Sequence, residues 1–574
     1  MEERREKRFK KYQVFYCLIC MCLMWGVTFF KIPSCAEETI LKSDAYQYGN
    51  DYWTYYYVMN EDGTAKIVDS SHSGISKADI TIPSTINGIR VTVIGEGAFQ
   101  TALIDSVVIS EGITTIEAYA FSNMVLENIT IPESVTVIEE RAFCRSGLKS
   151  ITIPDNVTSI EKAVFLYCVN LEEVRLPDRL IDIKEEAFAG CSKLKSIYIP
   201  ENVSNIEGGA FRNSGIEKFD VSQENLTYAQ IDGVLFEKNT RSLIAYPTRK
   251  EGEKYDIPKG ILSIGDDAFY DCSMLNSISI PEGVTCIGDR AFAYCSFSTI
   301  FIPDSVKSIG KEAFLSCQSL EKVTISKNID TIGEGAFSIC RKLKLNISVE
   351  NENYEEIEGV LFDKKTKTLL YYSPEKLNEE YTVPDEITRI GAYAFSMIDQ
   401  LKNIIIPDSV TSIGKHAFGG CDGLTNINIP DGVISIEEFA FSGCENLTDI
   451  IISDSVNRIE NSAFSGCESL ISINIPNGVE EIEENTFERC FNLTEVIIPD
   501  TVKSIGSCAF QSCSSLKSIV IPDSVNNIAN MAFDTREVKL IIERDSYAKE
   551  WAEKKHWPYE YIDANDWLTG EKNE

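Results

Sequence analysis

The chain has 574 residues, of which 44% are apolar and 10% aromatic, so it can bury enough side chains to fold. It carries 88 acidic and 54 basic residues, a net charge of −34. Such an acidic surface repels the phosphate backbone, which argues against nucleic acid as a partner and suits a soluble extracellular protein.

The N-terminus has the features of a secretory signal peptide. A basic start is followed by an apolar stretch over residues 14–30 and then by the small residues Ser34 and Ala36. This order predicts a signal peptide over residues 1–36. Two alternatives stay open: the apolar stretch is retained as a membrane anchor, or a lipid is attached to Cys35. All three place the rest of the chain outside the cytoplasm, and only the two alternatives would keep it at a membrane.

Residues 37–78 are predicted to form an N-terminal cap. Aromatic and apolar residues alternate over residues 46–68, on either side of Asp62 and Gly63. Alternation around an Asp-Gly pair is typical of a β-hairpin.

From residue 79 to residue 536 the chain repeats one pattern with a marker phenylalanine in each copy. Successive markers are 22 or 23 residues apart, except for two gaps of 58. The markers are Phe99, Phe121, Phe143, Phe165, Phe188, Phe211, Phe269, Phe292, Phe314, Phe337, Phe395, Phe418, Phe441, Phe464, Phe487, Phe510 and Phe533. A period of this size predicts a solenoid in which each turn contacts only its neighbours.

Each copy has two halves. In residues 470–476 the first half reads L-x-x-I-x-I-P, and its alternation predicts a short strand in a parallel sheet on one face, ended by proline. In the second half Val410 and Ile413 lie three residues apart, which predicts a short bent strand or an extended arc. We expect the stretch around Ala417 and Phe418 to form one helical or 3₁₀ turn on the other face.

The two long gaps, near residues 212–268 and 338–394, contain one insert each. Residues 225–247 and 353–374 share the pattern I-x-G-V-L-F-x-x-x-T-x-x-L, which indicates an internal duplication. We expect irregular long turns with hairpin-like inserts that protrude from the stack. Protruding loops often carry binding, and a tolerated insertion is the alternative.

Residues 537–562 are predicted to form a C-terminal cap with a strand over 538–543 and a helix over 547–555. Asp545 or Ser546 is the expected helix N-cap. Residues 563–574 are predicted to be a disordered tail.

The repeat phrase I-P-x-x-V-x-x-I-x-x-x-A-F-x-x-C-x-x-L resembles the BspA-type leucine-rich repeat. Residues 79–99 are similar to the usual opening copy of that family, and residues 545–552 are similar to its usual closing segment. The resemblance implies a right-handed leucine-rich repeat solenoid. It also implies a secreted or surface protein implicated in attachment, and it offers no shared catalytic residues.

Three residue types could suggest chemistry. Eleven of the 18 cysteines follow a marker by three residues, and we interpret them as small buried side chains, with metal ligands or disulfides as the alternatives. His416 has no nucleophile in its own copy. An acidic residue follows the repeat proline in many copies, and we interpret this row as solvated turns, with Ca²⁺ binding as the alternative. We predict no catalytic residue, no metal and no cofactor.

The outward position of the first strand forms the candidate ligand-binding stripe. Its selected residues are Tyr198, Phe301, Ile405, Asn428, Ile451, Asn474, Ile497 and Val520. An exposed uncharged stripe suits a protein ligand, and plain β-propensity is the alternative explanation.

Together these observations predict a secreted or cell-surface, non-catalytic protein that recognises an extracellular protein, for example in adhesion to host or neighbouring cells. The alternative is a glycan-binding surface protein for nutrient capture, in which Tyr198 and Phe301 stack on sugars.

Overall fold

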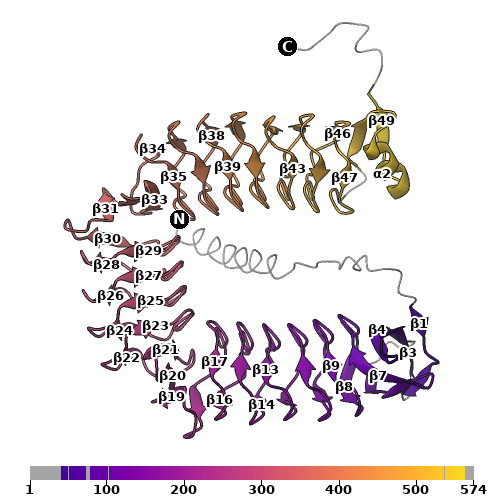
Figure 1. Cartoon of the computed structure of the whole chain (residues 1–574). Coiled ribbons are helices and arrows are strands. Elements are labelled where there is room, and N and C mark those ends of the chain that lie inside the picture. The colour runs from indigo at the N-terminus through magenta and orange to yellow at the C-terminus, as the bar shows by residue number, and fades with distance from the viewer. Residues whose placement is uncertain (1–39, 49–50, 73–77, 101, 535–536, 563–574) are drawn as a thin grey trace, which may run out of the picture.

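The computed structural model describes residues 40–48, 51–72, 78–100, 102–534 and 537–562. The predicted signal peptide and the predicted tail lie outside these residues. The described chain is a parallel β-solenoid bent into a C with three straight segments (Figure 1). We call them the N-terminal segment (40–221), the middle segment (228–347) and the C-terminal segment (354–562).

Each regular turn contributes one strand to an outer row and one strand to an inner row. The outer row lies along the outside of the C and the inner row along its inside (Figure 1). In the N-terminal segment the outer row is β5 (Ala78–Ile82), β8 (Ile104–Ile109), β10 (Asn128–Thr130), β12 (Ser150–Thr152), β14 (Glu173–Arg175), β16 (Ser196–Ile199) and β18 (Lys218–Val221). The inner row there is β7 (Ile89–Ile94), β9 (Thr115–Ile116), β11 (Val137–Ile138), β13 (Ser159–Ile160), β15 (Asp182–Ile183) and β17 (Asn205–Ile206), and β6 (Thr85–Ile86) pairs with β7.

The middle segment continues both rows. Its outer row is β22 (Lys254–Asp256), β24 (Ser277–Ser279), β26 (Thr299–Phe301), β28 (Lys322–Ile325) and β30 (Lys344–Ile347). Its inner row is β23 (Ser263–Ile264), β25 (Cys286–Ile287), β27 (Ser308–Ile309) and β29 (Thr331–Ile332).

In the C-terminal segment the outer row is β34 (Glu380–Thr382), β36 (Asn403–Ile405), β38 (Asn426–Ile429), β40 (Asp449–Ile452), β42 (Ser472–Asn474), β44 (Glu495–Ile497), β46 (Ser518–Ile521) and β48 (Lys539–Ile542). The inner row is β35 (Arg389–Ile390), β37 (Ser412–Ile413), β39 (Ser435–Ile436), β41 (Arg458–Ile459), β43 (Glu481–Ile482), β45 (Ser504–Ile505) and β47 (Asn527–Ile528). The outer ladder is interrupted after every two or three strands, whereas the inner ladder of this segment runs through four successive strands, from β35 to β41.

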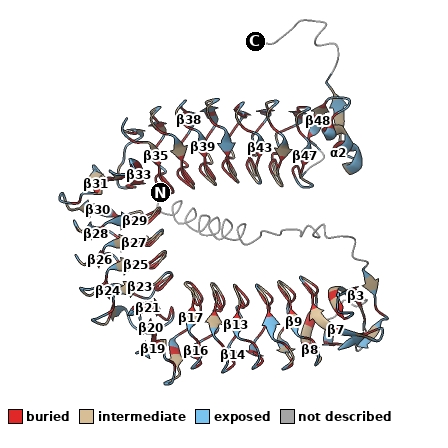
Figure 2. Cartoon of the chain, viewed as in Figure 1, coloured by how far each residue is buried: buried red, intermediate tan, exposed pale blue. Residues whose placement is uncertain are grey.

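The prediction of one helical or 3₁₀ turn at the marker phenylalanine is wrong, because the structure has a run of turns there. Residues on both sides of the marker have left-handed backbone, as Ser462 (φ 56) and Gly466 (φ 75) do around Phe464. The Phe464 N–H donates to the carbonyl of Thr486 in the next turn, at 3.0 Å. Because these N–H groups bond between turns and not four residues back, they form a third ladder and no helix. Figure 2 shows the buried residues in red in these turns, along the inside of the C.

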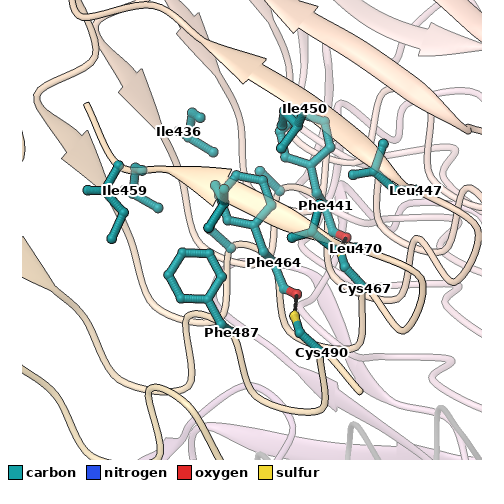
Figure 3. Close-up of a cluster of buried hydrophobic side chains, with 14 of the residues drawn as sticks. Ile436, Phe441, Leu447, Ile450, Ile459, Phe464, Cys467, Leu470, Phe487 and Cys490 are labelled. Atoms are coloured by element: carbon teal, nitrogen blue, oxygen red, sulfur yellow. Dashed lines mark hydrogen bonds between the residues drawn. The ribbon is translucent and has the colours of Figure 1, made fainter. Parts of the chain in front are cut away.

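The core consists of stacked columns, one for each apolar position of the repeat. From Phe395 to Phe533 successive marker rings lie 5.1 to 5.8 Å apart between centroids. Figure 3 shows three of these rings beside the leucine and isoleucine columns. Burying one such side chain stabilises the fold by about 1.5–3 kcal/mol, and a single turn cannot bury its own.

The inserts do not protrude, so that expectation is wrong. They form the hairpin strands β19 (Tyr228–Ile231), β20 (Val234–Glu237) and β21 (Ser242–Ala245) at one corner, and β31 (Tyr354–Ile357), β32 (Val360–Asp363) and β33 (Thr368–Tyr372) at the other. β21 pairs in parallel with β23, the first inner strand of the middle segment, and β33 pairs in parallel with β35, the first inner strand of the C-terminal segment. Leu235 packs in the core of the N-terminal segment, while Val234 and Phe236 pack in the core of the middle segment. The central strand of each insert is therefore buried between two cores.

Tyrosine hydroxyls close the inner row at both corners. β17 and β29 are followed by no further inner strand of their own ladder. The hydroxyl of Tyr228 accepts from the Ile206 N–H at 2.8 Å, and Tyr354 does the same for Ile332. These bonds satisfy buried N–H groups that would otherwise lack an acceptor.

The two ends carry additional elements. At the start, β1 (Leu41–Lys42) and β2 (Tyr46–Tyr48) pair with β3 (Asp51–Met59), which forms an antiparallel hairpin with β4 (Ala65–His72). β4 joins β7 in parallel, as β21 and β33 join their inner rows. At the other end, β48 is followed by α2 (Tyr547–Lys555) and β49 (Tyr559–Tyr561). The hydroxyl of Ser546 caps α2 and accepts from the Lys549 N–H at 3.3 Å.

Candidate recognition surface

The structure places all eight residues of the candidate stripe on outer strands with their side chains exposed. The apolar ones are Tyr198 (53% exposed), Phe301 (67%), Ile405 (55%), Ile451 (62%), Ile497 (52%) and Val520 (45%), and the exposed amides are Asn428 and Asn474.

The bends of the C divide this stripe. Tyr198 lies on β16 of the N-terminal segment and Phe301 on β26 of the middle segment, so the corners separate them from the rest. The other six residues lie on successive outer strands of the C-terminal segment. Asn428 pairs with Ile451, and Asn474 with Ile497, in the parallel register. The structure therefore brings together a single continuous surface, which we call the C-terminal stripe: Ile405, Asn428, Ile451, Asn474, Ile497 and Val520.

A row of exposed carboxylates runs beside the C-terminal stripe. It consists of Asp408, Asp431, Asp454, Asp500 and Asp523, each three residues after a stripe position. Among the ion pairs of the described residues, none includes a member of this row. Asp454 does not fit the sequence pattern of an acidic residue after the repeat proline, because it follows Ser453.

Buried charges bridge the inner side of the first corner, and the sequence pattern gave no sign of them. The carboxylate of Asp267, 1% exposed, accepts from Arg290 through Nε at 2.9 Å and Nη2 at 2.8 Å. Arg212 of the N-terminal segment lies 3.9 Å from the same carboxylate and also contacts Glu186. Burial opposes the charge on Arg212, but Glu186 and Asp267 outweigh it and raise its pKa. We call this set the corner cluster.

The second corner has a corresponding bridge. Nη2 of Arg389 lies 3.2 Å from Glu334 of the middle segment and 3.0 Å from Glu437 of the C-terminal segment. This arginine is about one third exposed, so solvent weakens the pairs.

The cysteine column serves the fold. All fourteen described cysteines are free thiols. Sγ of Cys467 donates to the backbone carbonyl of Phe441 in the preceding turn at 3.2 Å, and Cys490 to that of Phe464 at 3.3 Å (Figure 3). Burial raises the pKa of these thiols well above the usual range, so they stay protonated and unreactive.

His416 is also part of the packing. Its ring stacks between Tyr393, at 4.9 Å, and Phe439, at 4.7 Å between centroids. Burial, assisted by the nearby charge of Lys415, lowers the pKa of His416 to about 3. A general base needs a pKa near the working pH, which this imidazole does not have.

The described ranges contain neither a cluster of metal ligands nor a helix that could span a membrane. No group of three or more His, Cys, Asp or Glu side chains there is placed to hold a metal ion. In the same residues, no helix has the length and apolar character needed to cross a bilayer.

Short parallel strands, a repeat of 22 or 23 residues and stacked leucine, isoleucine and phenylalanine columns define a leucine-rich repeat solenoid. The profile of the BspA type leucine rich repeat region matches residues 59–161, 114–241, 248–369, 370–494 and 480–547. The chain belongs to the BspA-type leucine-rich repeat family.

Similar solved structures are bacterial repeat proteins. A leucine-rich repeat protein from Eubacterium ventriosum is 20% identical with a TM-score of 0.44, and the match covers 86% of this chain and 95% of that one. A leucine rich cell surface protein from Faecalibacterium prausnitzii is 24% identical over 86% and 95%, with a TM-score of 0.30. The pneumococcal vaccine antigen PcpA is 18% identical over 91% and 99%, with a TM-score of 0.34. Among curated proteins no match was found.

Proposed function

We propose that this chain is a secreted or cell-surface, non-catalytic protein that recognises an extracellular protein, as in adhesion to host or neighbouring cells. The observation that carries the proposal is the C-terminal stripe. Four of its six side chains are apolar and 45% to 62% exposed, in a chain whose net charge is −34. Exposed apolar side chains that gather in one uncharged stripe favour a protein interaction site.

The proposal is tested by replacing three apolar side chains of the C-terminal stripe with charged ones. The variant I405E/I451E/I497E places carboxylates where a partner would bury apolar surface. We expect binding to be lost. We expect each substitution to change the free energy of unfolding by no more than about 0.5 kcal/mol, because the side chains already face solvent. The measurement is a binding screen of the full chain and the variant against extracellular-matrix proteins and mucin, with thermal unfolding in parallel.

A matched control charges the same strand position elsewhere. T130E/T152E/T324E adds the same three charges on β10, β12 and β28, where these threonines are exposed. This control should bind like the parent chain. Unchanged affinity of the stripe variant, with both variants folded, would refute the proposal.

Glycan binding stays a prediction. Tyr198 and Phe301 lie in different segments, so each offers one ring to a sugar. A glycan array in the same format tests this alternative, and Y198A and F301A should then weaken the binding.

A further inference from the structure

The spacing of the C-terminal stripe and the charges beside it indicate the shape and the charge of its ligand. We infer that the stripe accepts an amphipathic α-helix of a partner protein. The helix lies along the stack, with apolar residues at every seventh position and basic residues along one flank. This inference rests on the proposed function, because it names the partner class for that same surface.

The three isoleucines occur in every second turn, and Val520 adds an apolar side chain one turn after Ile497. Ile405, Ile451 and Ile497 are two turns apart, with Asn428 and Asn474 in the turns between them. Adjacent strands lie about 4.8 Å apart, so alternate turns are separated by about 9.6 Å. Between β36 and β38, between β40 and β42 and between β44 and β46 the outer strands are not paired by ladder hydrogen bonds, so the strand-pairing distance does not hold these steps together.

An α-helix reproduces this spacing. Residues seven apart on a helix lie on nearly one face and are separated by about 10.5 Å along the axis. Over the three isoleucines the two repeats differ by about 2 Å in total, which flexible side chains absorb. An extended strand places alternate side chains about 6.8 Å apart and does not match. The asparagine amides then face the polar positions between the apolar anchors.

The row of carboxylates decides the charge of the ligand. Asp408, Asp454 and Asp500 are exposed, lie on one side of the C-terminal stripe and lack an ion-pair partner among the described residues. On the other side of the stripe lie uncharged Asn426 and Ser518 together with acidic Asp449 and Glu495. A helix in this position meets negative charge along its length, so lysine or arginine on its flank is complementary.

The test uses three synthetic peptides of 21 residues, the length of three heptads. The first has leucine at every seventh position and lysine along one flank. The second replaces the lysines by glutamate, and the third is a scrambled sequence with the composition of the first. Each is labelled, and its binding to the full chain is measured by fluorescence anisotropy at low and at physiological salt, with circular dichroism to follow helix formation.

We expect the basic patterned peptide to bind at least tenfold more tightly than the scrambled one and to gain helix on binding. I405E/I451E/I497E should weaken it at least tenfold, and T130E/T152E/T324E should not. D454N/D500N should weaken it several-fold and reduce its salt dependence.

Two results would overturn the inference. Equal binding of the basic patterned and scrambled peptides would show attraction of charge alone, and insensitivity to the stripe variant would place the peptide elsewhere. A protein from the screen that binds through the C-terminal stripe but does not compete with the peptide would refute the helix and leave the proposed function standing. If the stripe variant changes neither the binding found in the protein screen nor the binding of the peptide, both the proposed function and the helix inference are refuted.

Discussion

The corner cluster offers the sharpest test of how the bend is held. We expect D267N to destabilise the first corner by about 3 kcal/mol. The carboxylate is 1% exposed and binds Arg290 through two hydrogen bonds. Removing one partner of a buried pair costs about 3–5 kcal/mol, because the other charge stays uncompensated. The lower value applies because Arg290 and Arg212 are 30% and 24% exposed and are partly solvated.

Asparagine removes the negative charge of Asp267 without changing the backbone conformation at this position. Asp267 has φ 55, and asparagine tolerates this left-handed conformation. The loss of stability in D267N should be confined to the turns around the first corner, because a solenoid turn interacts mainly with its neighbours. Hydrogen exchange read by mass spectrometry measures this local stability, because peptides from residues 254–292 cover the first corner. A loss of about 3 kcal/mol corresponds to at least 100-fold faster exchange there.

An exposed ion pair serves as the control. Lys162 and Glu185 lie 2.6 Å apart with side chains 45% and 39% exposed. K162M should change local exchange by less than about fivefold, because exposed pairs contribute about 0–1 kcal/mol. If D267N and K162M behave alike, the corner cluster does not hold the bend and the reasoning fails.

Three further perturbations test the packing. His416 stays neutral to about pH 3 in the fold but is protonated below about pH 6.5 when unfolded, so its neutral burial costs stability as the pH falls, about 2 kcal/mol between pH 7 and 5. H416F should remove this acid sensitivity, and phenylalanine already occupies the same left-handed position in the next turn, at Phe439 (φ 56). The measurement is urea unfolding at pH 7 and at pH 5, and an equal loss of unfolding free energy in H416F and in the parent chain would contradict the prediction. C467A should cost about 1–3 kcal/mol in the same assay and C467S less, because the hydroxyl keeps the bond to the preceding turn; equal losses would show that volume alone matters. Y354F should cost about 1–3 kcal/mol by leaving the Ile332 N–H without an acceptor, and no loss would mean that water replaces the hydroxyl.

The sequence predicts the stack well because the period is a long-range signal repeated many times. The outer strand follows from alternation, and the structure places Ile473 and Ile475 inside and Asn474 outside as expected. The marker turn was misjudged because non-glycine residues such as Ser462 adopt left-handed backbone there, which no local preference indicates.

The inserts were also misjudged, although a signal was present. Val234, Leu235 and Phe236 form an uninterrupted apolar run, which is typical of a strand buried on both faces. The residues of the candidate stripe are exposed as predicted, because strand alternation determines which side chains face out. Its division by the corners could not be foreseen, because the bend depends on where the inserts interrupt both ladders.

The hairpins also divide the architecture into separately adjustable lengths. A hairpin that closes one core and begins the next lets a segment gain or lose whole turns without disturbing the others. Each turn added to the middle segment would move the two arms of the C apart by about one strand spacing, or 4.8 Å. The number of turns in the middle segment therefore determines the distance between the N-terminal and C-terminal segments. The surfaces of those two segments stay the same when that number changes.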